Sequence, residues 1–291
     1  MADIERLLIK AEAVLDRLET LLPSRPAAPD WSALAWRWQH QHGRGYLQAV
    51  AHPHRIRLDD LHHLEEQKAT IVRNTEQFVR GLPANNVLLT GARGTGKSSL
   101  VKALLSEFSG QGLRLVEVEK QDLHVLPEIV ELIRSRPERF IVFCDDLSFE
   151  AGESGYKALK VVLDGTLAAT SDNVLVYATS NRRHLLPEYM SENLETQHLG
   201  DEIRPGDSTE EKISLSERFG LWLSFYAFDQ EEYLQIARAW LADHGVTDWD
   251  EGVRRAALRF SLERGARSGR VAYQFARDYA GRQGLARAKK K

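Results

Sequence analysis

The residues with the clearest chemical meaning form one glycine-rich segment in the first half of the chain. It reads Gly91-Ala-Arg-Gly-Thr-Gly-Lys97-Ser98, a complete G-x-x-x-x-G-K-[ST] phosphate-loop motif. Glycines let the backbone turn tightly and direct N–H groups at phosphate oxygens, while the lysine reaches the outer phosphates and the serine hydroxyl binds Mg²⁺. The motif predicts a nucleotide-phosphate site formed by Gly91, Ala92, Arg93, Gly94, Thr95, Gly96, Lys97, Ser98 and Ser99.

Two adjacent acids at the end of an apolar run form a second element of such a site. Phe140–Cys144 is apolar, and Asp145 and Asp146 come directly after it. An acid at a strand end suits the water shell of Mg²⁺, so we expect Ser98 and Asp145 to serve the metal. Asp146 is placed to orient or activate an attacking water, although both acids could instead cap the next turn. Cys144 lies inside the run and is expected to be a small buried hydrophobe rather than a nucleophile.

Five short apolar runs must supply the strands that position these residues. They alternate with helical patterns, which is typical of a parallel sheet covered by helices on both faces. The runs are Val87–Leu89, Leu113–Val118, Phe140–Cys144, Val174–Ala178 and Leu221–Phe225. The helical patterns between them include Lys97–Glu107, Glu128–Ser135 and Tyr156–Ala169.

After Phe228 the chain has helical patterns only. Asp229 can cap a helix to about His244, and two more helices are predicted over Asp250–Glu263 and Ser268–Ala280. The sequence therefore predicts an α/β fold: a P-loop parallel five-stranded sheet with helices on both faces, a C-terminal all-helical lid and a short helical N-terminal region. The expected domains are residues 1–57, helical; 58–228, the nucleotide-binding core; and 229–291, the lid with a basic tail.

The N-terminal region is expected to be helical because of its apolar stripe and its aromatic content. Pro23, Pro26 and Pro29 mark a linker, and residues 31–58 are interpreted as a small helical element that docks on the rest of the chain. The stripe, too short for a long coiled coil, has steps of four and three residues and consists of Ile4, Leu8, Ala11, Leu15, Leu18 and Leu22.

Taken in order, these motifs resemble those of AAA+ ATPases over roughly residues 58–282. The resemblance implies binding of ATP and Mg²⁺, and it implies that the run from Val174 leads to a sensor 1 residue. That residue is Asn181, with Thr179 and Ser180 as alternatives. Arg218, within Ser-Glu-Arg-Phe-Gly, resembles an arginine finger that acts in trans on the γ-phosphate of a neighbouring subunit, where its planar cation stabilises charge.

Two further segments extend the resemblance. Gly265-Ala-Arg-Ser-Gly-Arg270 resembles the sensor 2 motif, in which Arg270 reaches the nucleotide from the lid and Arg267 is the alternative. Leu58–Gln67 resembles the segment that lies near adenine. The catalytic residues that the resemblance implies are Asp146, Asn181, Arg218 and Arg270.

At a finer level the chain resembles an uncharacterised bacterial AAA+ group, the domain-of-unknown-function 815 group. The resemblance lies in Asn85-Asn-Val-Leu-Leu, in Phe143-Cys-Asp-Asp-Leu-Ser-Phe-Glu150 and in Ala178-Thr-Ser-Asn-Arg-Arg-His184, and it implies a fold and an ATP site without a known task. One position departs from the AAA+ pattern, because Asp146 stands where these enzymes usually have Glu. The shorter side chain can place the water differently and slow the reaction, so hydrolysis is expected with its rate left open, and Glu150 is an alternative water-orienting residue.

Two functions are consistent with this pattern. The first is an oligomeric ATPase that hydrolyses ATP to remodel or load a macromolecular partner. The second is an ATP-gated adaptor or loader, a binding switch with slow or no hydrolysis. A small-molecule kinase on a P-loop scaffold would not explain Ser216–Gly220 or the separate helical C-terminus, and the absence of a pore-loop pattern disfavours a threading unfoldase.

Charge is distributed unevenly along the chain and suggests a partner. The formal net charge is −3, yet residues 143–232 hold 18 acids and 7 bases, whereas residues 251–291 hold 12 bases and 3 acids. A basic end on an acidic body favours contact with nucleic acid or with an acidic face of another subunit. The alternative is a solvated tail that only aids solubility.

Other features exclude some classes of protein and leave two segments unassigned. Apolar runs fall far short of the roughly 20 residues that cross a bilayer, the N-terminus shows no export signal, and the single cysteine fits a reducing cytoplasm. We therefore expect a cytoplasmic protein with no membrane partner. Six of the ten histidines lie within residues 40–63, where a metal site is less expected than surface or core histidines, and the acidic stretch 188–215 is predicted to be a surface loop.

Overall fold

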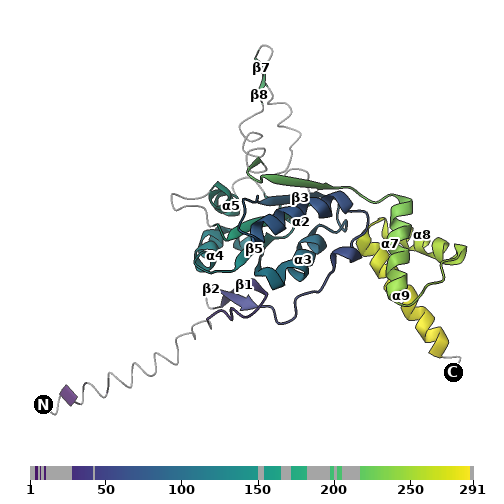
Figure 1. The fold of residues 1–291 in the computed structure, drawn as a ribbon, viewed down its shortest axis with the longest axis horizontal. Coiled ribbons are helices and arrows are strands. Elements are labelled where there is room, and N and C mark those ends of the chain that lie inside the picture. The colour runs from purple at the N-terminus through teal and green to yellow at the C-terminus, as the bar shows by residue number, and fades with distance from the viewer. Residues whose placement is uncertain are drawn as a thin grey trace.

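A seven-stranded sheet with the strand order β2-β1-β4-β5-β6-β3-β9 organises the fold (Figure 1). All neighbouring pairs are parallel except β1 and β2, and β7 and β8 form a separate antiparallel pair. The computed structural model describes residues 28–41, 43–149, 154–164, 172–181, 197–199, 202–204 and 217–288, with Ile4, Glu5, Leu7 and Lys10. The strands are β1 (Ala35–Gln41), β2 (Arg44–Ala49), β3 (Val87–Gly91), β4 (Leu113–Val118), β5 (Arg139–Cys144), β6 (Val174–Ser180), β7 (Gln197–Leu199), β8 (Glu202–Arg204) and β9 (Leu221–Phe225).

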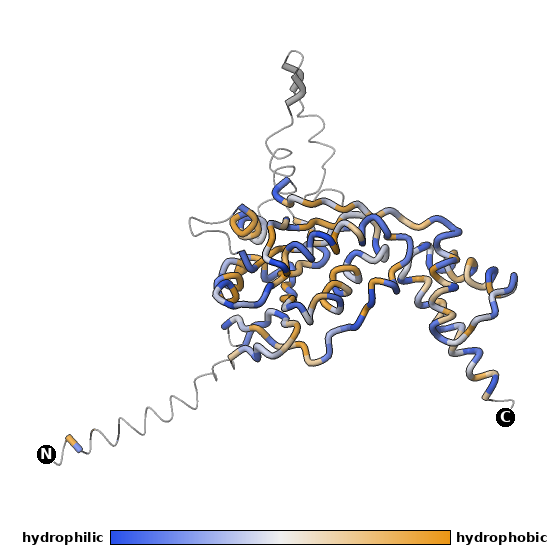
Figure 2. Tube along the Cα trace, viewed as in Figure 1, coloured by the Kyte–Doolittle hydropathy of each residue, from blue (hydrophilic) through white to orange (hydrophobic). Residues whose placement is uncertain are grey.

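Helices cover both faces of the large sheet. Helices α2 (Glu65–Val79) and α3 (Lys97–Phe108) pack on one face, and α4 (Leu126–Ile133) and α5 (Ser154–Asp164) pack on the other (Figure 1). Each central strand sends alternate side chains into two separate cores, so the strands read as unbroken apolar runs, which Figure 2 shows in orange. Short 3₁₀ turns, η1 (Leu58–Asp60), η2 (Ser109–Gln111) and η3 (Lys120–Val125), connect these elements.

Three helices form the C-terminal lid beside one end of the sheet (Figure 1). They are α7 (Gln230–Asp243), α8 (Glu251–Arg264) and α9 (Gly269–Ala288). Asp229 caps α7 in a capping box with Glu232, and Asp250 accepts a hydrogen bond from a backbone N–H of α8. The predicted helical C-terminus is therefore confirmed, with boundaries within a few residues of those expected, although α9 extends further.

The α/β class and all five predicted strands are confirmed, but the sheet has seven strands rather than five. The interpretation of residues 31–58 as helical is wrong, because this segment forms the hairpin β1–β2, and β1 continues the sheet in parallel beside β4. Trp36 and Trp38 alternate with exposed Arg37 and bury their rings in a core. Gly45 makes room for this packing, since a Cβ there would lie 1.9 Å from the ring of Trp38.

Several sequence predictions fall on residues outside the described part. These are most of the apolar stripe at residues 4–22, most of the acidic stretch 188–215, and Glu150. The domain boundaries remain a prediction. In the described part of the chain, no helix is both long and apolar enough to span a membrane.

Candidate functional site

One cleft of about 860 Å³ lies where the carboxyl ends of β3, β5 and β6 meet the lid. Parallel strands bring their carboxyl ends to the same edge of a sheet, and that edge is where α/β proteins place ligands. The phosphate loop forms the floor of the cleft, residues 54–64 form one wall, and α7 and the start of α9 form the other. Among its lining side chains are Arg93, Lys97, Ser98, Asp145, Asp146, Asn181 and Arg270.

The phosphate loop joins β3 to α3 through glycines in the left-handed region of backbone space. Gly91 has φ 132° and Gly96, the residue before the first turn of α3, has φ 99°. A Cβ on Gly91 would lie 1.8 Å from the carbonyl oxygen of Phe225 in the neighbouring strand. Both positions therefore require glycine, and the loop turns the amino end of a twelve-residue helix toward the cleft.

Lys97 lies almost fully buried at the floor of the cleft. Its Nζ donates to the carbonyl oxygens of Gly91 and Ala92 at 2.7 and 2.8 Å and to Oδ1 of Asn181 at 3.1 Å. All three acceptors are uncharged oxygens, and burial lowers the pKa of Lys97 despite the opposing charges of Asp145 and Asp146. A buried cation whose acceptors among the described residues are all neutral is suited to an anionic ligand.

Asp145 is held by two hydroxyl groups. Oδ1 of Asp145 accepts hydrogen bonds from Ser98 Oγ at 2.6 Å and from Thr179 Oγ1 at 2.5 Å. The three side chains come from the start of α3 and the ends of β5 and β6, and they place hard oxygen ligands side by side. Carboxylate and hydroxyl oxygens are the metal ligands that Mg²⁺ prefers.

Asp146 has an unusual backbone conformation that the neighbouring strand stabilises. Its φ is 54°, in the left-handed region, and its backbone N–H donates to Thr179 Oγ1 at 2.9 Å. Asn181 donates a hydrogen bond from Nδ2 to Oδ1 of Asp146, and Arg93 Nη2 lies 3.8 Å from Oδ2. A non-glycine residue at positive φ is uncommon and clusters at functional sites, so the position of this carboxylate is specified by its surroundings.

The lid contacts the phosphate loop directly. A Cβ on Gly94 would lie 2.8 Å from Oγ of Ser268, and a Cβ on Gly269 would lie 3.3 Å from the carbonyl oxygen of Gly94. This close approach brings Arg270, the second residue of α9, into the lining of the cleft, where its charge acts on Lys97. Arg267, the alternative to Arg270, is exposed and does not line the cleft.

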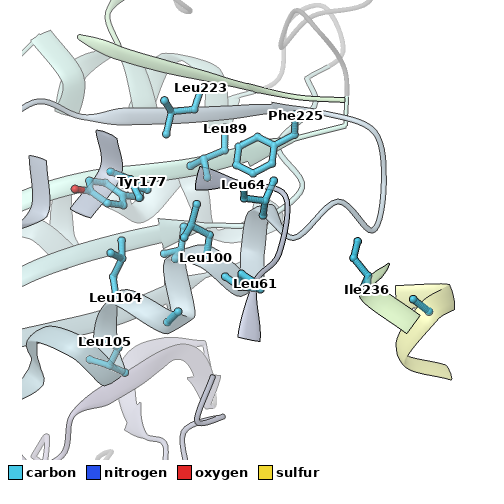
Figure 3. Packing of buried hydrophobic residues seen from close by; sticks show 14 of the residues in the cluster. Leu61, Leu64, Leu89, Leu100, Leu104, Leu105, Tyr177, Leu223, Phe225 and Ile236 are labelled. Atoms are coloured by element: carbon cyan, nitrogen blue, oxygen red, sulfur yellow. The ribbon is translucent and has the colours of Figure 1, made fainter. Parts of the chain in front are cut away.

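The far end of the cleft is apolar and aromatic. Leu61 and Leu64 lie beside Leu100 at the end of the core that faces Ile236 of α7 (Figure 3). The remaining apolar and aromatic lining residues are Ile56, Phe228, Trp240 and Tyr273. The rings of Trp240 and Tyr273 meet edge to face with their centroids 4.9 Å apart. Within Leu58–Gln67, residues 60, 61, 62 and 64 line the cleft, and the predicted position of this segment near adenine stays a prediction. The aromatic pair was missed, since two rings from separate helices give no local pattern.

Arg218 lies away from this cleft. It precedes β9, whose first residue, Leu221, pairs with Val87 at the beginning of β3, so it lies toward the amino ends of the strands, whereas the cleft lies at their carboxyl ends. Its Nε donates to Oδ1 of Asp164 at the end of α5 at 2.6 Å. Within one subunit Arg218 therefore does not join the other predicted site residues.

The family of the chain is established by comparison with known protein families. Residues 31–283 match the model of the family described as protein of unknown function (DUF815). The chain belongs to this family. The resemblance to that group in the sequence motifs is confirmed, and no curated protein matches the chain.

The DUF815 protein also has similarities among solved structures. The RuvB Holliday junction branch migration motor of Thermotoga maritima is 17% identical with a TM-score of 0.47, covering 76% of this chain and 63% of that one. Two variants of the same RuvB, each with a single substitution, are 16% and 14% identical, both with a TM-score of 0.46. Their matches cover 76% of this chain in both cases, and 63% and 61% of the variants. The chain thus spans less than two thirds of the length of these proteins.

The remaining predictions for the DUF815 protein concern histidine and cysteine. Within the described ranges, no three His, Cys, Asp or Glu side chains gather to hold a metal ion. Of the histidines between residues 40 and 63, His40 bonds to Asp122 at 2.7 Å, and His54 and His62 line the cleft. Cys144 is fully buried, and burial raises its pKa to about 12, as expected for a structural residue.

Proposed function

We propose that this DUF815 protein is an AAA+ ATPase that binds ATP with Mg²⁺ and hydrolyses it. The observation that carries the proposal is the arrangement at the floor of the cleft. Among the described residues, the acceptors in contact with buried Lys97 are all uncharged, and this cation lies at the amino end of α3 beside Asp145 and Asp146. A triphosphate supplies the anion that this cation and this helix end lack.

The residues present fit both ATP and Mg²⁺. The loop from Gly91 to Ser99 would surround the phosphates, Lys97 would bind the outer ones, and Ser98 and Asp145 would hold the metal directly or through its water shell. The metal would neutralise charge on the phosphates. The apolar and aromatic end of the cleft, which includes Leu61, would accept the base.

The roles in hydrolysis are assigned from hydrogen-bond chemistry. Asp146 would accept a hydrogen bond from the attacking water. Asn181, which contacts Asp146 and Lys97, would orient these two side chains. Arg270 would bind phosphate from the lid. Asp146 has a shorter side chain than Glu, so its backbone position at φ 54° would decide where the water lies.

Steady-state phosphate release tests this function. The wild-type protein should release phosphate from ATP, and Lys97→Ala should abolish release while the protein remains folded. Lys157→Ala is the matched control, because Lys157 is exposed on α5, which covers the other face of the sheet, and does not line the cleft. Equal release by the wild type and by Lys97→Ala would reject the ATPase.

A second subunit would complete the site through Arg218. Arg218 lies outside the cleft of its own subunit, toward the amino ends of the strands, and this position supports action in trans. Specific ATPase activity should then rise with protein concentration, and Arg218→Ala should abolish that rise while ATP still binds. Activity per subunit that stays constant on dilution would contradict an oligomeric enzyme.

The second candidate function is an ATP-gated adaptor or loader with slow or no hydrolysis. It is favoured by the engagement of both carboxylate oxygens of Asp146 by Asn181 and Arg93. Single-turnover measurement separates the two functions: hydrolysis far slower than nucleotide exchange indicates a switch, and hydrolysis at a comparable rate indicates a cycling enzyme.

The partner would be a macromolecule, with nucleic acid favoured by the lid. Residues 251–288 hold nine arginines and three acids. Within the described ranges, ion pairs engage Arg254, Arg259 and Arg282, whereas five arginines outside the cleft have no acidic partner: Arg255, Arg264, Arg267, Arg277 and Arg287. DNA or RNA should bind at low salt, should dissociate steeply as salt rises and should change the ATPase rate. No binding at low salt would instead direct attention to a protein partner.

A further inference from the structure

Arg93 occupies a position of the phosphate loop where the loop itself requires no particular side chain. It is the third residue of G-x-x-x-x-G-K-[ST], one of four variable positions. Its side chain is 78% exposed, lines the cleft and reaches Asp146, with Nη2 3.8 Å from Oδ2. A long cation on the floor of a phosphate site thus contacts the acid that the proposed reaction uses.

Among the described residues, Arg93 is the cation that pairs with Oδ2, the carboxylate oxygen of Asp146 that Asn181 does not contact. Asn181 donates to Oδ1, and Thr179 holds the backbone N–H of Asp146 in place. A water that is to lose a proton to Asp146 needs a free oxygen at hydrogen-bonding distance. While Arg93 stays paired, Oδ2 has a cation at 3.8 Å that competes with a water for this oxygen.

We propose that Arg93 is a positioning residue that changes partner when ATP binds: its guanidinium moves from Oδ2 of Asp146 to the terminal phosphate. This inference rests on the proposed ATPase function. The phosphate carries more charge than a single carboxylate and offers more oxygens to the planar guanidinium, so it is the stronger partner. The bound phosphate and the carboxylate of Asp146 would both border the phosphate loop, so Arg93 can change partner by side-chain rotation alone.

The exchange links binding to chemistry within one subunit. Once released, Oδ2 of Asp146 takes a proton from the attacking water, whose oxygen forms a bond to the γ-phosphorus. The bond from that phosphorus to the bridging oxygen breaks, and the products are ADP and phosphate. Asn181 remains on Oδ1 throughout and keeps the carboxylate oriented. Without ATP, Asp146 stays paired.

The other cations of the cleft are not equivalent to Arg93. Lys97 contacts Asn181 and the loop carbonyls, and Lys102 pairs with Glu117. Among the described residues, Arg93 is the cation that forms an ion pair with Asp146. Removal of Arg93 should therefore affect ATP and ADP differently and should also release Oδ2 of Asp146.

The test compares nucleotide affinity with turnover in Arg93→Ala, Arg93→Lys and the wild type. ATP and ADP affinities are measured by calorimetry with Mg²⁺, and hydrolysis is measured in single turnover at saturating ATP. Arg93→Ala should weaken ATP binding by about tenfold to a hundredfold, the range for one hydrogen bond to a charged group, and should leave ADP binding nearly unchanged. Arg93→Lys should restore part of the ATP affinity, because it keeps the charge but loses the planar pair of donors.

The control is Arg73→Ala, which removes an equal charge from the exposed face of α2 and should change neither affinity nor rate. Equal losses of ATP and ADP affinity in Arg93→Ala, or no loss, would overturn the role of Arg93 while leaving the ATPase intact. Failure of the wild type to bind or hydrolyse ATP would instead overturn the proposed function itself, and the inference with it.

Discussion

Replacing Lys97 with methionine separates the stability of the fold from binding at the site. Methionine has similar length and no charge, so Lys97→Met keeps the packing and removes the ammonium group. In the free protein, that group makes three hydrogen bonds to uncharged oxygens, and the residue is 6% exposed. The substitution therefore removes a buried cation together with its hydrogen bonds.

The two contributions to stability nearly cancel. Three hydrogen bonds from a charged donor contribute about 5–9 kcal/mol in all, and removal of an ammonium from water costs a similar several kcal/mol. The lowered pKa of Lys97, caused first by burial, shows that the site disfavours the charge in the free protein. We expect Lys97→Met to change the free energy of unfolding by less than about 1.5 kcal/mol, with stabilisation as the favoured sign.

Binding should respond in the opposite way. With the triphosphate bound, the ammonium gains an anionic partner, so its loss should weaken ATP binding by at least about a hundredfold. Urea unfolding without nucleotide gives the stability, and calorimetry with ATP and Mg²⁺ gives the affinity. Lys157→Met is the control, because it removes an exposed cation from α5 and should change the free energy of unfolding by about 0.5 kcal/mol or less.

Two results would refute the reasoning about Lys97. A loss of more than about 3 kcal/mol of unfolding free energy in Lys97→Met would show that the ammonium stabilises the fold through its carbonyl contacts. Unchanged ATP affinity would show that the buried cation is not the phosphate ligand. Either result is readily distinguished from the expected pair of a stable protein and weak binding.

Further measurements test the site, the core and the lid. Because burial lowers the pKa of Lys97, the free protein loses this proton below the ordinary value of 10.5, and ATP affinity should fall as pH rises toward that value; Lys97→Arg stays charged and should show a flatter profile, so parallel profiles would contradict this. The thiol of Cys144, with a pKa of about 12, should resist a disulfide reagent at about pH 8 in the native protein and become reactive at the urea concentration of the unfolding midpoint. Fast labelling of the native protein would disprove its burial. Asp229→Ala should cost about 1 kcal/mol of unfolding free energy through loss of the α7 cap, measured by urea unfolding, and no loss would show that the lid unfolds separately.

The parts of the fold that the sequence predicted are those set by local pattern. Val87–Leu89 and Phe140–Cys144 are buried on both faces, so they form continuous apolar runs that periodicity identifies as central strands. Asp229 precedes a helical stretch and forms the expected cap, and Asp250, predicted as the start of the next helix, caps it. Local chemistry was sufficient for these elements.

The hairpin β1–β2 was missed because its signal is short and its partner is distant. Trp36-Arg37-Trp38 alternates for a few residues only, and its burial depends on pairing with β4, about eighty residues away. The cross-strand ion pair of Arg37 with Glu117 at 2.8 Å joins the same distant strands. A pattern of aromatic residues alone does not distinguish a helix from a strand whose neighbour is unknown.

In the candidate site, too, the sequence predicted positions that are set locally but not contacts between distant segments. Motif spacing could place Lys97 and Ser98 relative to the phosphates, because the loop and the start of its helix fix their positions. It could not show that Arg93 contacts Asp146, since that contact depends on the positive φ of Asp146, which β6 stabilises through Thr179. The distance from Arg93 to Asp146 is therefore set by a third strand. A substitution such as Thr179→Val, which removes the hydroxyl that holds both Asp145 and the backbone of Asp146, should disturb the proposed metal ligand and the proposed water-orienting acid together.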